Sequence, residues 1–257
     1  DPARAAEARA ILDTAIALQE QLVAMAEAVP EYRSKLASMC DSLANLLRAQ
    51  HRFPEAESLY RKELAYQSRL AADYPQVLAY RFGHGQVLHN LADLLRERGR
   101  PAEALPLERE AVRLLSSVYQ SNVRNPDYRT AISYAWWTLC AILIDRKDHR
   151  AAATAIAEYL RLEPNGYEES FEAAEFLCRC AQIVRADPAV PADQREPLAR
   201  SYADRAIDAL RTAIRNGFRD AKHLESDPAY APIRDRDDFR RLIQEIEAMT
   251  ETTGATS

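Results

Sequence analysis

Residue types that could support catalysis or metal binding are present in this sequence, but their spacing does not form a site. Gly83-His84-Gly85 contains the glycines of a phosphate-binding loop, without a strand before it or a lysine after it. His84 and His89 are five residues apart, which is the wrong step for two ligands on one helix face. The acidic turn at 235–238 lacks the glycine and the closing glutamate of a calcium loop. We therefore predict no catalytic residue, no metal site and no cofactor.

The cysteines predict a reduced protein. Each lies inside an apolar helical stretch, where a thiol behaves as a small buried hydrophobe. Cys178 and Cys180 are two residues apart, a spacing that suits neither a zinc knuckle nor a redox pair. Reduced core thiols indicate a reducing compartment, so we expect a cytoplasmic protein. The four residues are Cys40, Cys140, Cys178 and Cys180.

Composition excludes several classes of partner. Of the 257 residues, 28% are charged, and the net charge of −5 is well mixed, without a basic stripe for nucleic acid. The apolar run at 135–143 is far shorter than the ~20 residues that span a bilayer. We expect neither nucleic acid nor membrane as a partner. Glycine is scarce, while Ala, Leu, Glu and Arg recur throughout, which favours helices.

An internal repeat of 48 residues is the main signal in the chain. A Tyr-Arg pair recurs at Tyr32, Tyr80 and Tyr128, and an apolar five-residue block follows each pair eleven positions later. Self-similarity at such a period is typical of solenoid proteins, in which each repeat stacks on its neighbours.

Each repeat reads as two helices joined by a short turn. In the first copy, apolar residues recur at three- and four-residue steps from Tyr32 to Ala49. Pro54 opens a second helix that ends at Asp73, and in the second copy Gly99 suits the left-handed end of a helix. Small residues twelve positions apart let the two helices approach closely. These pairs are Ala44 with Ala56, Ala92 with Ala104, and Cys140 with Ala152.

The predicted organisation follows the repeat. Residues 1–29 read as the second helix of a repeat, so we expect its partner helix upstream of Asp1, in a chain that does not begin with Met. Three full repeats, a degenerate repeat and a helical cap complete a solenoid over 1–249, followed by a disordered tail. The predicted bounds are 30–76, 78–125 and 127–165 for the repeats, 166–217 for the degenerate repeat, 218–249 for the cap and 250–257 for the tail.

The repeat resembles the tetratricopeptide repeat (TPR). Leu followed by a small residue, and a second small residue twelve positions on, is present as Leu43-Ala44 with Ala56 and as Leu91-Ala92 with Ala104. Both helices are longer than in the usual unit of about 34 residues. The resemblance implies an all-α fold, a right-handed superhelical solenoid of antiparallel helix pairs with a C-terminal helical cap.

The C-terminal region resembles a narrower group. This region is similar to the closing part of TPR regions that follow bacterial serine/threonine kinase domains, particularly of the planctomycete type. The matching segments are 202–220, 223–224, 227–228, 233–234 and 239–242. The sequence has no glycine-rich loop, no His-Arg-Asp catalytic loop and no Asp-Phe-Gly. The resemblance thus implies a non-catalytic extension of a kinase.

The TPR resemblance also implies where a partner would bind. In this family the first helices line a concave groove that holds an extended peptide, and asparagines at the places of Asn45 and Asn90 hold the peptide main chain. The cations that grip a terminal carboxylate are replaced by Asp41, Tyr134 and Thr138, so an acidic chaperone tail is not the expected ligand. The implied partner-binding residues are Asn45, Asn90, Arg48, Arg96, His89, Asp93, Tyr134 and Trp137.

Each of these residues also has a structural interpretation. The two asparagines could face water or bond between helices, Arg48 and Arg96 could belong to a solvated helix surface, and Trp137 could pack against the fourth copy. We predict a scaffold that binds an extended peptide or partner protein, as part of a larger bacterial protein such as a kinase. The alternative is self-association, in which the segment forms homo-oligomers and brings attached catalytic domains together.

Overall fold

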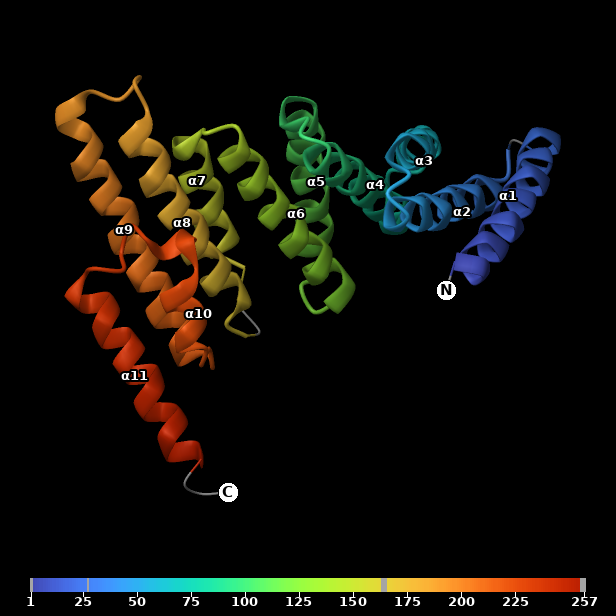
Figure 1. The fold of residues 1–257 in the computed structure, drawn as a ribbon. Helices are drawn as coiled ribbons and strands as arrows, with labels where there is room; N and C mark the ends of the chain where they lie inside the picture. The colour runs from blue at the N-terminus through green and yellow to red at the C-terminus, as the bar shows by residue number, and fades with distance from the viewer. Residues whose placement is uncertain (1, 27, 163–165, 255–257) are drawn as a thin grey trace. The chain divides into compact units, whose positions relative to one another are not determined.

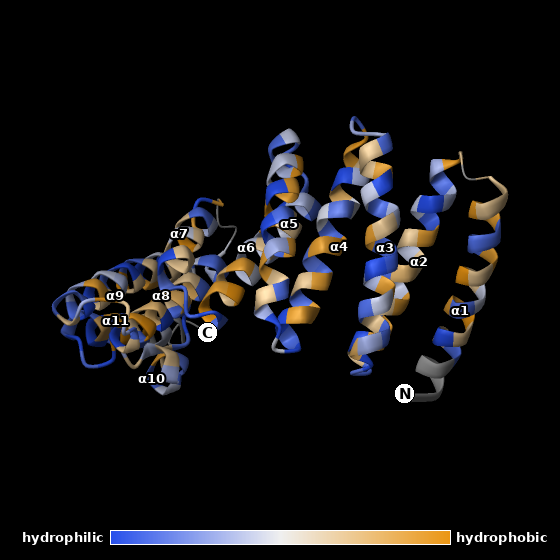
Figure 2. Cartoon of the chain, turned by 90° about the horizontal axis from the view of Figure 1, so that it is seen from above, coloured by the Kyte–Doolittle hydropathy of each residue, from blue (hydrophilic) through white to orange (hydrophobic). Residues whose placement is uncertain are grey.

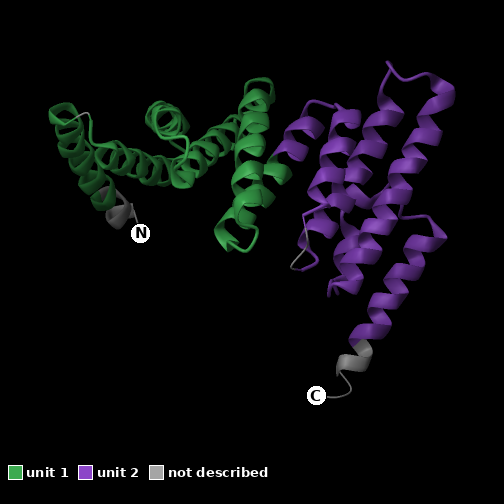
Figure 3. Cartoon of the chain, turned by 180° about the vertical axis from the view of Figure 1, so that it is seen from behind, with its two compact units in different colours: residues 1–138 green, residues 139–257 purple. Residues whose placement is uncertain are grey.

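The computed structural model describes residues 2–26, 28–162 and 166–254, and the described residues contain no β-strand. They form eleven α-helices and one short 3-10 helix, in the order shown in Figure 1. The all-α fold class predicted from the sequence is confirmed. The chain divides into two compact units, residues 1–138 and 139–257, and the division falls inside α6 (Figure 3).

In the first unit, each helix packs against the next one along the chain. Contacts join α1 to α2, α2 to α3, α3 to α4 and α4 to α5, which is the sequential packing of a TPR-type solenoid. These helices show both hydrophobic and hydrophilic residues around their turns (Figure 2). The bounds are α1 (Pro2–Met25), α2 (Pro30–Ala49), α3 (Phe53–Asp73), α4 (Leu78–Glu97), α5 (Pro101–Ser121) and α6 (Pro126–Asp145).

One turn conformation recurs at the 48-residue period. His51, Gly99 and Lys147 have φ values of 57°, 70° and 59°, so each first helix ends on a left-handed residue. The next residue donates its main-chain N–H to the carbonyl five positions back in every copy, as Arg100 does to Leu95 at 2.8 Å. The left-handed conformation predicted at Gly99 is confirmed, and His51 and Lys147 adopt it without the conformational freedom of glycine.

Small residues are buried on both helices of each pair. The six positions predicted from the twelve-residue spacing all have side chains with 0% of their surface exposed. Around them, large side chains such as Leu36, Tyr60 and Leu95 fill the space between the helices. The small residues are therefore buried at all six positions, as a close approach of the paired helices requires.

The second unit continues with helix pairs and then shorter elements. α8 packs against α7 and α9, and α11 packs against α9 and α10. The four cysteines are free and buried, as the sequence predicts. The bounds are α7 (His149–Tyr159), α8 (Glu168–Ala186), α9 (Ala192–Arg215), α10 (Ala221–Ser226), η1 (Pro228–Tyr230) and α11 (Asp237–Gly254).

Helix α11 corrects the predicted start of the C-terminal tail. The sequence predicts disorder from residue 250, yet the helix continues to Gly254. Thr250 remains helical and donates its hydroxyl to the Ile246 carbonyl at 3.2 Å, a local bond that small polar composition does not reveal. Residue 27, at the end of the predicted first helix, and residues 255–257 lie outside the described residues; α1 itself ends at Met25.

The glycines of Gly83-His84-Gly85 have a packing role in α4. A Cβ on Gly85 would lie 2.8 Å from Cγ and Cδ2 of Leu115, a buried residue of α5. A Cβ on Gly83 would instead meet the end of the flexible Gln67 side chain. Gly85 therefore allows the close approach of α4 to α5.

We expect Gly85→Ala to lower the free energy of unfolding. Overpacking in a closed core costs about 1–3 kcal/mol, which exceeds the ~1 kcal/mol that alanine contributes over glycine in a helix. Urea denaturation followed by circular dichroism measures the difference. Gly83→Ala is the matched control and should have a smaller effect; equal or higher stability for Gly85→Ala would contradict the close-approach role.

Candidate functional site

The residues implied by the TPR resemblance lie on α2, α4 and α6 of the first unit. α2 carries Asn45 and Arg48, and α6 carries Tyr134 and Trp137. The four candidates on α4 are His89, Asn90, Asp93 and Arg96. Side-chain contacts connect α2 to α4 at two places, and Arg96 of α4 lies over the Trp137 ring of α6. The structure thus brings residues up to 92 positions apart, from Asn45 to Trp137, onto three helices of one unit.

Arg48 is the centre of an ion-pair cluster between α2 and α4. Its Nη2 lies 2.6 Å from Oδ2 of Asp93, and its Nε lies 2.9 Å from Oε2 of Glu97. Arg96 lies 3.1 Å from the other carboxylate oxygen of Asp93. Burial alone would raise the pKa of Asp93, but the hydrogen bond and charge of Arg48 outweigh burial and lower it. The cluster holds its charges in place across two repeats rather than leaving them free in solvent.

Both asparagines make hydrogen bonds within the protein. Nδ2 of Asn90 donates to Oδ1 of Asp41 at 3.0 Å, and Oδ1 of Asn45 accepts from the Tyr60 hydroxyl at 2.6 Å. Burial raises the pKa of Asp41, and hydrogen bonds from Asn45 and Asn90 partly offset that effect. Each amide retains further hydrogen-bonding capacity, since an asparagine side chain has two donors and one acceptor. Their role in holding a peptide stays a prediction.

His89 pairs with a carboxylate that the sequence analysis missed. Its Nδ1 lies 3.0 Å from Oε1 of Glu108 on α5, which has 0% of its surface exposed. In the 48-residue register Glu108 takes the place of Tyr60. An acidic residue at a core position of the repeat was the available signal, because buried carboxylates require a specific partner.

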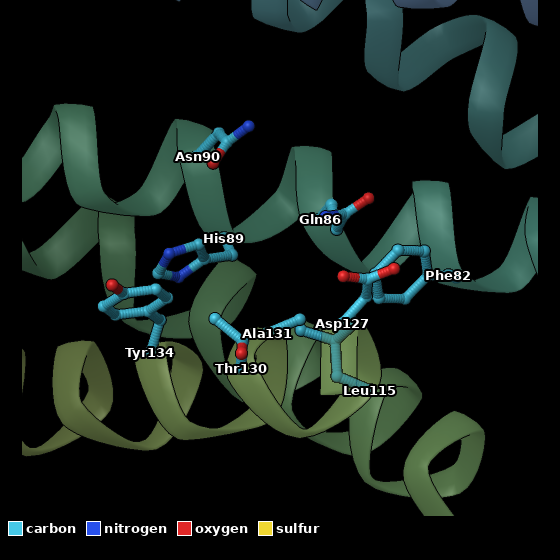
Figure 4. A pocket seen from close by; sticks show the side chains of 9 residues that line it. All are labelled: Phe82, Gln86, His89, Asn90, Leu115, Asp127, Thr130, Ala131 and Tyr134. Carbon is cyan, nitrogen blue, oxygen red and sulfur yellow. The ribbon is translucent and has the colours of Figure 1, made fainter. Parts of the chain in front are cut away.

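A pocket of about 500 Å³ lies against α4 and α6. His89 projects into it from α4 and Tyr134 from α6, as Figure 4 shows. Tyr134 is 62% exposed, unusual for a large aromatic side chain, whereas Trp137 is half-buried, with the Arg96 guanidinium 5.5 Å from its ring centroid. The lining residues are Phe82, Gln86, His89, Asn90, Leu115, Asp127, Thr130, Ala131 and Tyr134.

A His–Tyr–Cys group in the second unit joins three helices. His149 is buried and its Nδ1 lies 2.9 Å from the Tyr202 hydroxyl, while Sγ of Cys180 lies 3.7 Å from the His149 carbonyl oxygen. Burial raises the pKa of Cys180 to about 12, so the thiol stays protonated at neutral pH and is a poor nucleophile. These contacts hold α7 to α8 and α9.

The described residues form neither a metal-binding cluster nor a membrane-spanning helix. None of their His, Cys, Asp and Glu side chains gather in threes in a way that could hold a metal ion. Among the helices formed by these residues, none combines the length and apolar character needed to cross a membrane.

This geometry defines the class of protein as a helical repeat protein with a polar face and a pocket on its first helices. Residues 35–117, which cover most of α2 to α5, match the tetratricopeptide repeat family model. The match supports a TPR protein. No curated protein sequence matches the chain.

Solved structures show only distant similarity. BtubC (BKLC) from P. vanneervenii is 16% identical, with a TM-score of 0.37 over 83% of this chain and 93% of that chain. A computationally designed self-assembling cyclic homo-oligomer is 14% identical, with a TM-score of 0.31 over 96% of this chain and 99% of that chain.

Glu63 on α3 gives the unit a distinct pH dependence. Its side chain is buried, and Oε2 has no hydrogen-bond partner among the described residues. Burial, and then the charge of Asp41, raise its pKa from 4.5 to about 9. The folded state therefore keeps a proton on Glu63 at pH values where the unfolded chain has released it.

We expect Glu63→Gln to stabilise the protein increasingly as the pH rises. Below the unfolded pKa of 4.5, both side chains are neutral and the two proteins should have similar free energies of unfolding. Between that value and about 9, wild-type stability falls relative to the variant, by at most ~1.4 kcal/mol per pH unit. Urea denaturation at pH 4.5, 7 and 9 measures the difference, and a constant difference across this range would contradict a protonated buried Glu63.

Proposed function

We propose that this chain is a non-catalytic interaction module that binds an extended segment of a partner protein along α2, α4 and α6. Tetratricopeptide repeats generally mediate protein–protein interaction and self-assembly. The pocket with the exposed Tyr134 is the observation that carries the proposal, because exposed aromatic side chains beside a pocket are typical anchors of protein interfaces. Amides and paired charges beside it suit a peptide main chain.

The binding face has features of a preorganised interface. The contacts of Arg48, Asp93 and Arg96 hold long side chains in one arrangement before a partner arrives. A partner then loses less free energy to the ordering of this surface on binding. Phe82 and Leu115 give the pocket an apolar part, while Gln86 and Thr130 supply hydrogen-bonding groups. This combination suits an extended peptide with one anchoring residue.

The similarity of the C-terminal region to kinase-associated TPR regions supports a finer proposal. In it, this module recruits a substrate or regulator to a bacterial serine/threonine kinase, with the catalytic motifs elsewhere in the same protein. The coding sequence upstream of Asp1 tests the proposal. A His-Arg-Asp catalytic loop there would support it, and further repeats without one would contradict it.

The α1 surface favours self-association as a second candidate. Ile11, Leu18, Leu22 and Met25 are all exposed, and Leu18 retains 58% of its surface. Leu22 corresponds in the register to Leu70 of α3 and Val118 of α5, which are fully buried. An exposed stripe at these positions is typical of a contact surface for another helix. In this second candidate a second copy of the chain covers the stripe, in place of the partner helix that the repeat pattern predicts.

We expect Tyr134→Ala to weaken peptide binding at the pocket about tenfold, equivalent to ~1.4 kcal/mol. Loss of an exposed aromatic anchor should leave the fold intact because the ring contributes little to the core. Enrichment from a library of ten-residue peptides, followed by fluorescence anisotropy, measures the affinity. Val123→Ala, which shortens another exposed apolar side chain, is the control. Equal binding by both variants and the wild type would exclude the pocket.

If self-association is the function, we expect Leu18→Glu to convert an oligomer into a monomer, because a charge replaces the centre of the apolar stripe. Light scattering at increasing protein concentration measures the mass. Val123→Glu places the same charge at an exposed position outside α1 and should leave the mass unchanged. A wild-type protein that stays monomeric at high concentration contradicts this second candidate.

A further inference from the structure

The His89–Glu108 pair places a proton-controlled group in the pocket wall. Oε1 of Glu108 bonds to Nδ1 of His89, and Oε2 has no hydrogen-bond partner among the described residues. Because Glu108 is fully buried, an ionised carboxylate there needs a charged partner. His89 lines the pocket, and Nε2 is the ring nitrogen that the Glu108 contact leaves for a ligand.

Burial of Glu108 and its contact with His89 favour a shared proton. Burial raises the pKa of Glu108 to about 7, and the contact with His89 partly offsets this rise. Burial lowers the pKa of His89, but the hydrogen bond and charge of Glu108 outweigh it and raise that pKa. Asp93 favours protonation of both groups, whereas Arg48 opposes it at His89 and Arg96 opposes it at Glu108.

The two groups therefore titrate as one pair, and the full burial of the carboxylate against the imidazole favours the state in which they share one proton. On the α6 wall of the pocket, Asp127 adds a negative charge, and Tyr134 is the other titratable group.

The number of hydrogens on the pair then determines whether Nε2 of His89 donates or accepts a hydrogen bond. If the proton is on His89, both ring nitrogens carry hydrogen; if it is on Glu108, the carboxyl donates to Nδ1 and the ring hydrogen lies on Nε2. Nε2 is a donor in both cases. After the pair loses its proton, the remaining ring hydrogen must bond Nδ1 to the carboxylate, so Nε2 becomes an acceptor.

We propose that the pocket binds a neutral carbonyl group of the partner peptide through Nε2–H of His89, and that loss of the shared His89–Glu108 proton at alkaline pH releases it. The proposal rests on the proposed peptide-binding function and names the group recognised. The protonated pair has no net charge, and Asp127 disfavours a carboxylate in the same pocket. A main-chain or side-chain amide carbonyl is therefore the preferred acceptor.

A pH titration of the full chain with ¹⁵N-labelled histidine tests the pair without a ligand. We expect Nε2 of His89 to carry hydrogen at pH 7 and to lose it with a midpoint above the usual ~6.5 of histidine. Glu108→Gln should lower the midpoint by at least about one unit, a tenfold change. His89→Gln identifies the signal. If Glu108→Gln does not fold, Glu108→Tyr introduces the residue of the first repeat at this position. The proposal is overturned if the titration midpoint of His89 is close to ~6.5 in the wild type and is the same in the Glu108→Gln or Glu108→Tyr variant.

Binding of a ten-residue peptide library capped at both ends tests the ligand. Peptides enriched at pH 6.5 should bind the wild type about tenfold more weakly at pH 8.5, whereas His89→Gln should bind with the same affinity at both pH values. Wild-type binding that does not change with pH overturns the inference but leaves the proposed function intact. The same peptides with a free C-terminal carboxylate are measured in parallel, and binding by these peptides but not by the capped ones overturns the neutral carbonyl. Failure of any peptide to bind contradicts the proposed function itself, and the titration still decides the state of the pair.

Discussion

Burial of a small side chain on each helix of a pair is the constraint on which the rest of this structure depends. Ala92 and Ala104 have no exposed surface, and a larger residue at either place would push α4 away from α5. The left-handed residue between the paired helices brings the second helix back along the first. Because both features recur every 48 residues, the first helices present equivalent positions repeatedly. This repetition places the residues of the candidate site on α2, α4 and α6.

Polar groups on these helices are organised by partners within the protein. Arg48 joins carboxylates of the next repeat, and Asn90 reaches back to Asp41. Such contacts across repeats reduce the freedom of long side chains and hold one surface arrangement. The burial of Glu63 and Glu108 has an energetic cost, because an ionised carboxylate without a paired charge is unfavourable in the core. The protein thus combines a stable repeat framework with local sites whose protonation depends on pH.

The two candidate functions use different surfaces of the first unit. Peptide binding uses the pocket beside Tyr134 and the polar groups of α2 and α4, whereas self-association uses the outer stripe of α1. One surface is mainly polar with an aromatic anchor, and the other is a row of aliphatic side chains. This chemical difference makes the two functions separable by substitution. It also allows one chain to perform both, since neither surface contains residues of the other.

The sequence by itself determined the helix pairs and the period. Periodic apolar residues and prolines are local signals, and they placed the ends of α2 and α3 at Ala49 and Asp73. Only the tertiary structure decided which side chains meet. The pairing of His89 with Glu108, and of Asn45 with Tyr60, depends on the distance and rotation between helices. Those quantities follow from the packing of the whole unit, which no local sequence pattern specifies.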